Sequence, residues 1–338
     1  LLKCNLSKRR TNHFGEDKMT LEKIGNTDLY LITSKKINPY KDTIPIYIKL
    51  ESQNPTKSIK DRMVHYVVSK AKEEVPKETT FVSASSGNTG SSLAYVCKLL
   101  NFKCIIVTNT KCSEEKIKAC QDYGAEVIVG DSDAAPDSDE HYQNIAINLA
   151  SSNPNYFDLD QYGNEKNTKS YYKTLGPEIW EETAGQITHF VTGGSTCGTI
   201  MGVGRFLKEK KENITIVLAD PIGSSISGFV MGREVVSDLG SYVIEGVGKD
   251  SVPKLLDREL INSVIGVSDQ EAIDMCHMLK SEEGIHLGGS SGLNVSAAVK
   301  LASEAVPGSK IVTVGCDSGV KYESKIYNDD WLRENNFS

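Results

Sequence analysis

Short apolar runs alternate with segments of helical periodicity along most of the chain. The apolar runs predict strands at residues 44–50, 79–85, 102–109, 125–131, 187–194, 214–221 and 310–317. Helical patterns fall between them, near residues 59–74, 88–100, 113–123, 138–151, 168–183, 199–211, 269–281 and 291–304. Several strands lack a polar alternation, which is typical of strands covered on both faces. The pattern therefore predicts an α/β protein with mostly parallel sheets.

Composition narrows the class of protein. The chain has 338 residues, of which 39% are hydrophobic and 25% charged, as in soluble globular proteins of one large or two modest domains. Its formal net charge of −7 gives no electrostatic case for a nucleic-acid partner. No apolar run approaches the roughly 20 residues that span a bilayer, and no signal-peptide pattern opens the chain. We therefore expect a cytoplasmic protein without a membrane partner.

The cysteines predict neither a metal site nor a disulfide framework. Eight cysteines and six histidines show no CxxC pair and no metal-ligand spacing. Most of the cysteines lie in apolar stretches, where they are expected to be small core residues of a protein in a reducing compartment.

Two loops rich in glycine and hydroxyl residues follow predicted strands. SASSGNTGSS (83–92) precedes a helix and exposes backbone N–H groups that suit a carboxylate, although a capped turn explains it equally well. TGGSTCGTIMG (192–202) suits a phosphate, with a tight turn as the alternative. It contains neither GxxxxGK[ST] nor GxGxxG, so a nucleoside triphosphate or a dinucleotide is not expected.

Two further stretches complete the candidate chemistry. NPTKSIKDR (54–62) places Lys60 at the start of a predicted helix, and CDSGVKY (316–322) ends the last strand with Asp317 and Ser318. A lysine amine, a phosphate cup, a carboxylate cup and a small polar group are the set that pyridoxal 5′-phosphate requires. Lys60 is therefore predicted to be the Schiff-base lysine rather than a surface charge.

The order of the motifs resembles a known family. The chain is similar to the fold-type II pyridoxal-phosphate enzymes of the cysteine synthase and cystathionine β-synthase family, which are related to the tryptophan synthase β chain. The matching stretches span roughly residues 20–332 and read IGNT (24–27), NPTKSIKDR (54–62), SSGNTG (85–90), LDQYGN (159–164), GPEIW (176–180), GGSTCGT (193–199), EGVG (245–248), EEGIHLGGSSG (282–292) and DSGVKYESK (317–325).

The resemblance implies a role for each matching residue. Lys60 holds the cofactor and moves protons, and Asn88 hydrogen-bonds the cofactor's ring oxygen. Ser318 faces the pyridine nitrogen, or Asp317 does so if the turn is shifted by one residue. The phosphate cup comprises Ser195, Thr196, Cys197, Gly198 and Thr199, and the substrate carboxylate is held by Ser85, Ser86, Gly87, Thr89 and Gln161.

The resemblance also implies an architecture and a reaction. Residues 19–61 and 168–338 form a large cofactor-binding domain, residues 62–167 a smaller mobile domain, and residues 1–18 an N-terminal arm. The cofactor lies in the cleft between the two domains of a homodimer subunit. The reaction is β-replacement at Cβ of a serine-type amino acid in sulfur amino-acid metabolism, through a bound aminoacrylate that takes up a thiol or sulfide.

Several positions depart from the family pattern. Asp28 stands where the family has proline, Ser83-Ala84 where it has Glu-Pro, and Lys57 and Cys197 where it has glycine. None of these changes removes a catalytic atom, but together they leave the identity of the substrate undecided.

Asp250, after EGVGK, suggests an alternative reaction. As a base it would assist hydrogen-sulfide release from L-cysteine, with water giving L-serine or a second thiol giving a thioether. Its carboxylate would alternatively orient an amine or hydroxyl group of the second substrate. A capping or solvated aspartate explains it equally well.

A serine/threonine dehydratase and a non-catalytic regulatory homologue are further alternatives. The motifs LDQYGN and EGVG argue against the first, and the retention of Lys60, Asn88 and the phosphate cup argues against the second.

Overall fold

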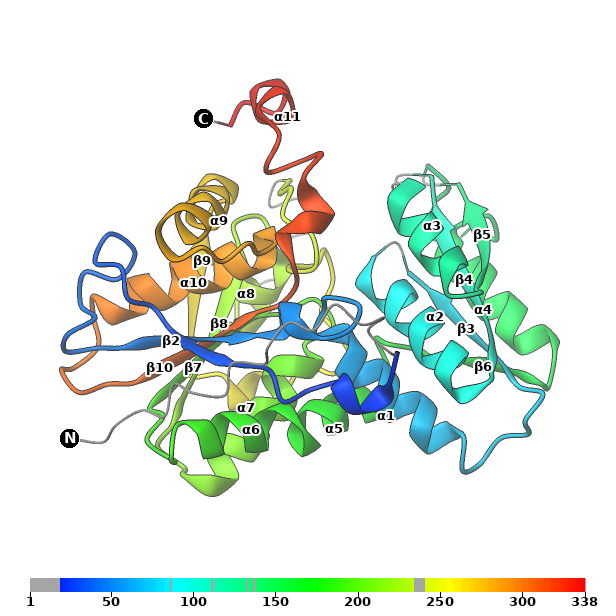
Figure 1. The fold of residues 1–338 in the computed structure, drawn as a ribbon, viewed down its shortest axis with the longest axis horizontal. Helices are drawn as coiled ribbons and strands as arrows, with labels where there is room; N and C mark the ends of the chain where they lie inside the picture. Colours follow the sequence, from blue (N-terminus) through cyan, green and yellow to red (C-terminus); the bar gives the residue numbers. More distant parts are fainter. Residues whose placement is uncertain are drawn as a thin grey trace.

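Two mostly parallel sheets, each flanked by helices, form two lobes (Figure 1). The computed structural model describes residues 19–337 except 86, 111, 113, 132, 136, 137 and 234–240. The predicted arm at residues 1–18 and the candidate Ser86 lie outside these residues. We call residues 80–158 the small lobe and the other described residues the large lobe. The predicted α/β class with mostly parallel sheets is confirmed.

The large lobe contains a six-stranded sheet in the order β1-β2-β10-β7-β8-β9. Only β1 is antiparallel to its neighbour. Its strands are β1 (Leu29–Leu31), β2 (Ile46–Leu50), β7 (His189–Gly193), β8 (Thr215–Pro221), β9 (Ser263–Val267) and β10 (Ile311–Gly315). Helices α9 (Asp269–Glu283) and α10 (Gly289–Ala302) cover one face of this sheet, and α5 (Lys166–Lys173), α6 (Leu175–Glu182) and α7 (Gly198–Lys210) cover the other (Figure 1).

The small lobe contains a four-stranded, fully parallel sheet in the order β5-β4-β3-β6. Its strands are β3 (Thr80–Ala84), β4 (Lys103–Asn109), β5 (Glu126–Gly130) and β6 (Tyr156–Asp158). The predicted strands are found in both sheets close to their expected bounds. The short strands β1, β6 and β9 were not predicted.

The helices mostly follow the predicted pattern. They are α1 (Lys60–Ala71), α2 (Asn88–Leu100), α3 (Glu114–Asp122), α4 (Tyr142–Ser152), α5 (Lys166–Lys173), α6 (Leu175–Glu182), α7 (Gly198–Lys210), α8 (Ser225–Val230), α9 (Asp269–Glu283), α10 (Gly289–Ala302) and α11 (Asp329–Glu334). Short 3₁₀ segments lie at Leu21–Lys23, Glu51–Gln53, Arg258–Leu260 and Gly319–Tyr322.

The prediction of one helix over residues 168–183 is wrong. The chain breaks at Thr174 (φ −122°, ψ −70°) into α5 and α6. Pro177 lacks an N–H group and its ring clashes with the carbonyl of residue i−4 in a continuous helix, so the break precedes it by three residues.

Helix α1 joins the cores of the two lobes. Its buried face carries Met63, Val64, Val67 and Val68, which are fully buried in one hydrophobic cluster with residues of α2 and α7. Each such side chain contributes roughly 1.5–3 kcal/mol of hydrophobic free energy relative to an exposed one. This packing fixes the first turn of α1, where Lys60 lies.

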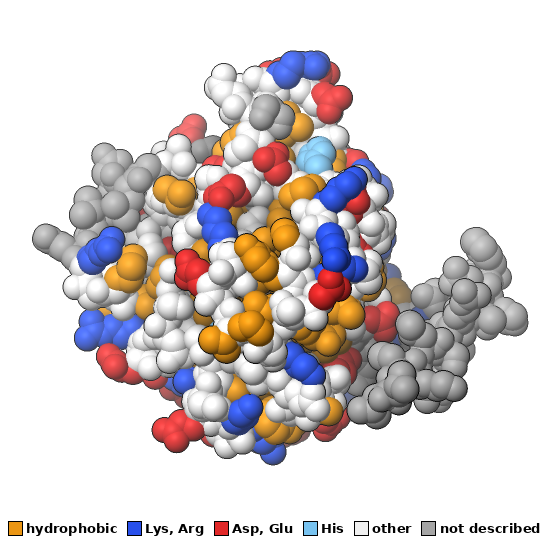
Figure 2. Space-filling model, turned by 90° about the vertical axis from the view of Figure 1, so that its left-hand side faces the viewer, with side chains coloured by type: hydrophobic (Ala, Val, Ile, Leu, Met, Phe, Trp, Pro, Cys, Tyr) orange, Lys and Arg blue, Asp and Glu red, His pale blue; other side chains and the backbone are white. Residues whose placement is uncertain are grey.

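One face of the large lobe carries an apolar region. Figure 2 shows hydrophobic side chains gathered near the centre of the face that the large lobe presents. Among the helices of the described residues, none is long and apolar enough to cross a membrane.

Candidate active site

A cavity of about 490 Å³ lies between the lobes, where loops follow the carboxyl ends of β2, β3 and β7. This is the edge of a parallel sheet where ligands bind in α/β proteins. Many of the predicted site residues line it together: Lys60, Ser85, Gly87, Asn88, Thr89, Gln161, Ser195 and Thr196. They come from four segments that are far apart in the sequence, so the fold brings the lysine and both predicted cups to one place.

Lys60 is the first residue of α1 and is held there by the end of β10. The backbone N–H of Ile59 donates to the carbonyl of Cys316 at 2.8 Å, and Ser58 pairs with Asp317. Burial lowers the pKa of Lys60, although the nearby Cys316 and Asp317 oppose that shift. A lowered pKa makes the neutral, nucleophilic amine more available at neutral pH.

The loop after β3 is held by its own hydroxyl groups. Ser85 Oγ accepts hydrogen bonds from the backbone N–H groups of Gly87 (3.2 Å) and Gly90 (3.0 Å). Thr89 Oγ1 donates to Gln161 Oε1 at 2.8 Å, which links two of the residues predicted to hold the substrate carboxylate. Gly87, Asn88 and Thr89 thus line the cavity from a turn that hydrogen bonds hold in place.

The loop after β7 leads directly into the N-terminus of α7 and packs closely there. A Cβ atom on Gly198 would lie 2.0 Å from Asn167 Oδ1, so only glycine fits there. Asn167 Nδ2 in turn donates to Thr196 Oγ1 at 3.2 Å. The start of a helix with adjacent hydroxyl groups is a favourable site for a phosphate.

Cys197 and Lys57 occupy the positions where the resembled family has glycine, and both have left-handed backbone, with φ of +61° and +59°. That conformation explains why glycine is expected at these positions. The Cys197 side chain is buried, and burial raises the pKa of its thiol to about 12. It is therefore a packed cysteine, not a reactive thiolate.

Comparison with known proteins decides the family. The sequence profile described as "Pyridoxal-phosphate dependent enzyme" matches residues 21–317. The chain belongs to this family. The predicted resemblance and the predicted cofactor, pyridoxal 5′-phosphate, are thereby confirmed.

The relatives of this pyridoxal-phosphate enzyme include proteins named cystathionine β-synthase and proteins named cysteine synthase. It is 34% identical over 320 residues to a cystathionine β-synthase of Apis mellifera, an alignment that covers 94% of this chain and 62% of the relative. It is also 34% identical over 340 residues to a cysteine synthase of Dictyostelium discoideum, covering 96% of this chain and 88% of the relative. The chain thus spans less than two thirds of the length of the cystathionine β-synthase.

A solved structure is also similar. The crystal structure of a hydrogen sulfide-producing enzyme from Fusobacterium nucleatum superposes with a TM-score of 0.80 at 31% identity, covering 89% of this chain and 98% of that one.

The residues of the cavity fit the family's cofactor. Lys60 supplies an amine of lowered pKa, and Ser195 and Thr196 reach the same cavity from the glycine-rich start of α7. Buried Asn167 Oδ1 has no hydrogen-bond partner among the described residues, which leaves polar capacity beside that helix start. An aldehyde with a phosphate arm requires this pairing of amine and anion site. Gly198 and Thr199 form the first residues of α7 and do not themselves line the cavity.

Asp317 and Ser318 are buried and do not line the cavity. Asp317 is 1% exposed and its Oδ2 accepts hydrogen bonds from Asn88 Nδ2 and Tyr322, both at 2.8 Å. The backbone N–H of Ser318 donates to the carbonyl of Lys57 at 3.2 Å. Neither lines the cavity, and the partner of the ring nitrogen stays a prediction.

Asp250 is exposed and lies outside the cavity that holds Lys60. Its neighbours Lys249 and Ser251 line an adjacent cavity of about 490 Å³, which shares Gln161 and Tyr162 with the first. The Lys249 ammonium lies 4.5 Å from the centre of the Tyr162 ring. The structure brings the Asp250 segment near the site without placing its carboxylate inside.

Sequence reasoning missed several side chains that line the main cavity. They are Asn109, Lys116, Tyr142, Tyr162, Tyr242, Glu245, Tyr322 and Lys325. Tyr162, Glu245, Tyr322 and Lys325 fall inside quoted motifs, so the motifs themselves were the available signal. Nothing in the local sequence of the others indicates that they face a cavity.

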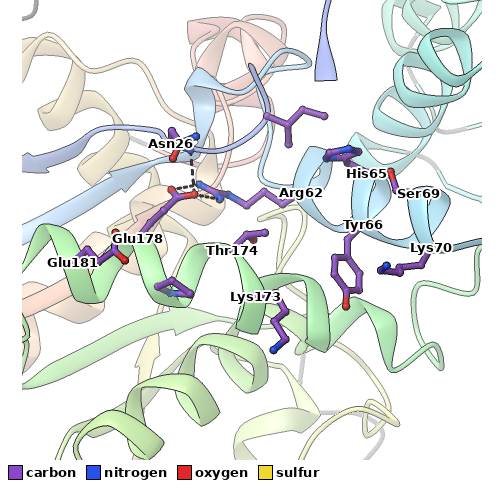
Figure 3. Close-up of a pocket in the computed structure, with 12 residues that line it drawn as sticks. Asn26, Arg62, His65, Tyr66, Ser69, Lys70, Lys173, Thr174, Glu178 and Glu181 are labelled. Atoms are coloured by element: carbon purple, nitrogen blue, oxygen red, sulfur yellow. Dashed lines mark hydrogen bonds and ion pairs between the residues drawn. The ribbon is translucent and has the colours of Figure 1, made fainter. Parts of the chain in front are cut away.

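A second cavity, of about 420 Å³, lies along α1, α5 and α6 (Figure 3). Its wall contains a buried ion network: Arg62 contacts Glu51 and Glu178, each at 2.6 Å. Fully buried Lys49 lies 3.0 Å from Glu178 and 2.7 Å from Glu182. Since each buried cation has carboxylate partners, the network is structural.

Proposed function

We propose that the protein catalyses pyridoxal-phosphate-dependent β-replacement at Cβ of a serine-type amino acid in sulfur amino-acid metabolism, exchanging a thiol or sulfide. The proposal rests on one observation: a single cavity contains Lys60, the loop after β3 and the residues before the start of α7. Relatives named cysteine synthase and cystathionine β-synthase support the same reaction class.

The roles of the residues follow from their places in the cavity. When bound, the cofactor supplies an aldehyde for the lysine and an electron-withdrawing ring that stabilises negative charge at the substrate Cα. Lys60 removes the Cα proton and returns it after the new bond forms at Cβ. The carboxylate of the amino acid binds at Ser85, Ser86, Gly87, Thr89 and Gln161.

The remaining predicted residues would hold the cofactor. Asn88 faces its ring oxygen, and Ser195 to Thr199 hold its phosphate with the N-terminus of α7. Ser318 or Asp317 serves the ring nitrogen.

We further propose that residues 62–167 close over the substrate as a mobile domain and that two copies of the chain form a dimer. The apolar region in Figure 2 and exposed hydrophobic side chains such as Leu31, Tyr40 and Val306 are compatible with a subunit interface. We also propose a cytoplasmic location, because cysteines such as Cys97, Cys104 and Cys276 are packed in the hydrophobic core, as in proteins of a reducing compartment.

Visible absorption of the purified protein tests the reaction. Serine, O-acetylserine and cysteine are added separately, with sulfide or homocysteine as the second substrate, and the sulfur product is identified by mass spectrometry. The expected result is a change in the cofactor band and a new C–S bond with at least one pair. A protein that binds the cofactor but gives no product with any pair would refute the proposal.

Release of hydrogen sulfide from L-cysteine is a second candidate. The similarity to the Fusobacterium nucleatum enzyme favours it. Asp250 would then activate the water that adds at Cβ and yields L-serine. Asp250→Asn is expected to lower sulfide release at least tenfold, and unchanged release would exclude this role for Asp250.

A further inference from the structure

Two charged side chains hold the amide of Asn88 from opposite ends. Asn88 Nδ2 donates to Asp317 Oδ2 at 2.8 Å, and Lys321 Nζ donates to Asn88 Oδ1 at 2.6 Å. An ammonium only donates hydrogen bonds and a carboxylate only accepts them. The amide therefore has a single orientation, with its oxygen toward Lys321 and its nitrogen toward Asp317.

The three residues come from the two lobes. Asn88 begins α2 in the small lobe and lines the cavity that contains Lys60. Asp317 and Lys321 follow β10 in the large lobe, and Ser58 pairs with Asp317 just before Lys60. The contact thus couples the position of Asn88 to the segment that carries the lysine.

Charge balance explains why Lys321 belongs to this group. Asp317 is almost completely buried, and its second oxygen, Oδ1, has no hydrogen-bond partner among the described residues. A buried carboxylate of this kind requires a nearby cation. Burial raises the pKa of the Asp317 carboxyl group, and the charge of Lys321, whose own hydrogen bond goes to Asn88, opposes that shift.

The arrangement also changes the donor strength of Asn88. Nδ2 carries two hydrogens, and only one is used by Asp317, which leaves the second for a group in the cavity. A cation bound to Oδ1 withdraws electron density from the amide and strengthens its remaining N–H donor, as in hydrogen-bond chains.

We propose that Lys321 and Asp317 are positioning residues that orient and polarise the amide of Asn88 toward the ring oxygen of the cofactor. The inference rests on the role of Asn88 in the proposed function, but not on which amino acid or sulfur compound reacts.

The test compares Lys321→Met, Lys321→Gln and Lys321→Arg in the full chain carrying its cofactor. Lys118→Met is the matched control, because Lys118 is an exposed lysine that pairs with Asp122 within α3. The readouts are the wavelength of the visible absorption maximum, the rate of cofactor loss on dialysis and the melting temperature.

Lys321→Met and Lys321→Gln are expected to shift the absorption maximum and to lose the cofactor at least fivefold faster. Lys321→Arg, which keeps the charge, is expected to stay close to the parent chain, as is the Lys118 control. A folded Lys321→Met or Lys321→Gln variant with the parent spectrum and the parent rate of cofactor loss would overturn the inference. So would a fall in melting temperature with no change in spectrum, because that result indicates a purely structural lysine.

None of these readouts depends on catalysis. If the Lys321 variants show the spectral effects but the parent chain makes no C–S bond, the proposed reaction is refuted and the role of Lys321 is supported. A parent chain that takes up no cofactor would refute both.

Discussion

The ammonium of Lys116, on α3 of the small lobe, lies 2.9 Å from the carboxylate of Glu245 in the large lobe. Both side chains line the cavity that contains Lys60, and Lys325 contacts the other oxygen of the same carboxylate. Burial disfavours the charged form of Glu245. Lys116 and Lys325 outweigh this effect of burial and lower the pKa of the Glu245 carboxyl group. The Glu245 carboxyl group is therefore favoured in its ionised form, and its contact with Lys116 connects the lobes across the cavity.

Loss of this ion pair should favour opening of the lobes. The side chains of Lys116 and Glu245 are 18% and 35% exposed, so the pair is worth only about 1 kcal/mol. Lys116→Met is expected to speed amide hydrogen exchange at the start of α2 about fivefold. Lys118→Met removes an exposed pair within α3 and serves as the control. Equal exchange in the two variants would contradict the prediction.

Lys60 should react with electrophiles at a lower pH than an ordinary lysine. Burial lowers its pKa from the usual 10.5, so a given fraction of neutral amine is reached at lower pH. Pulsed acetylation of the cofactor-free protein over a pH series, read by mass spectrometry, measures this, with N-acetyl-lysine amide as the reference. A Lys60 profile that coincides with the reference or lies at higher pH would show that burial does not shift this amine downward.

Glu178 should contribute stability that is lost in acid. Burial opposes its ionisation, but Arg62 and Lys49 outweigh burial and lower the pKa of Glu178 from 4.5 to about 2. In the unfolded chain the carboxylate takes up its proton at higher pH than in the folded chain. The stability from this group is therefore complete above about pH 4.5 and is lost as the pH falls toward 2.

Urea unfolding of the parent chain and of Glu178→Gln between pH 6 and 3 measures this contribution. The variant should be less stable at pH 6 and should show a shallower decline with acid. Parallel declines in the two proteins would mean that Glu178 is not responsible.

Lys57→Gly should stabilise the fold. Lys57 has φ of +59°, a conformation that costs a residue with a Cβ atom about 1–2 kcal/mol. Glycine removes this cost but gains entropy in the unfolded chain, so a net gain of about 0.5–1 kcal/mol is expected. The free energy of unfolding in urea measures it. Lys57→Ala keeps the Cβ atom and should show no gain, whereas an equal gain in both variants would point to the lysine charge instead.

Much of the fold was readable from the sequence because hydrophobic periodicity and turn residues are local. The long buried strands such as β4 and β8 were predicted, since continuous apolar runs mark strands covered on both faces. Strands β1 and β6 have only three residues each, too few for a periodic signal, and they exist because they pair with β2 and β3. The break at Thr174 depends on Pro177, and the periodic pattern across it predicted one continuous helix.

The sequence by itself determined the chemical inventory: a lysine at a helix start, a hydroxyl-rich loop, a glycine-rich helix start and their order along the chain. The tertiary structure alone decided which of these groups meet. It placed Lys116 against Glu245 and fixed the amide of Asn88 between Asp317 and Lys321, while it left Asp250 on the surface. Local sequence sets backbone conformation within a few residues, but contacts between residues more than 200 positions apart depend on how the two sheets are packed.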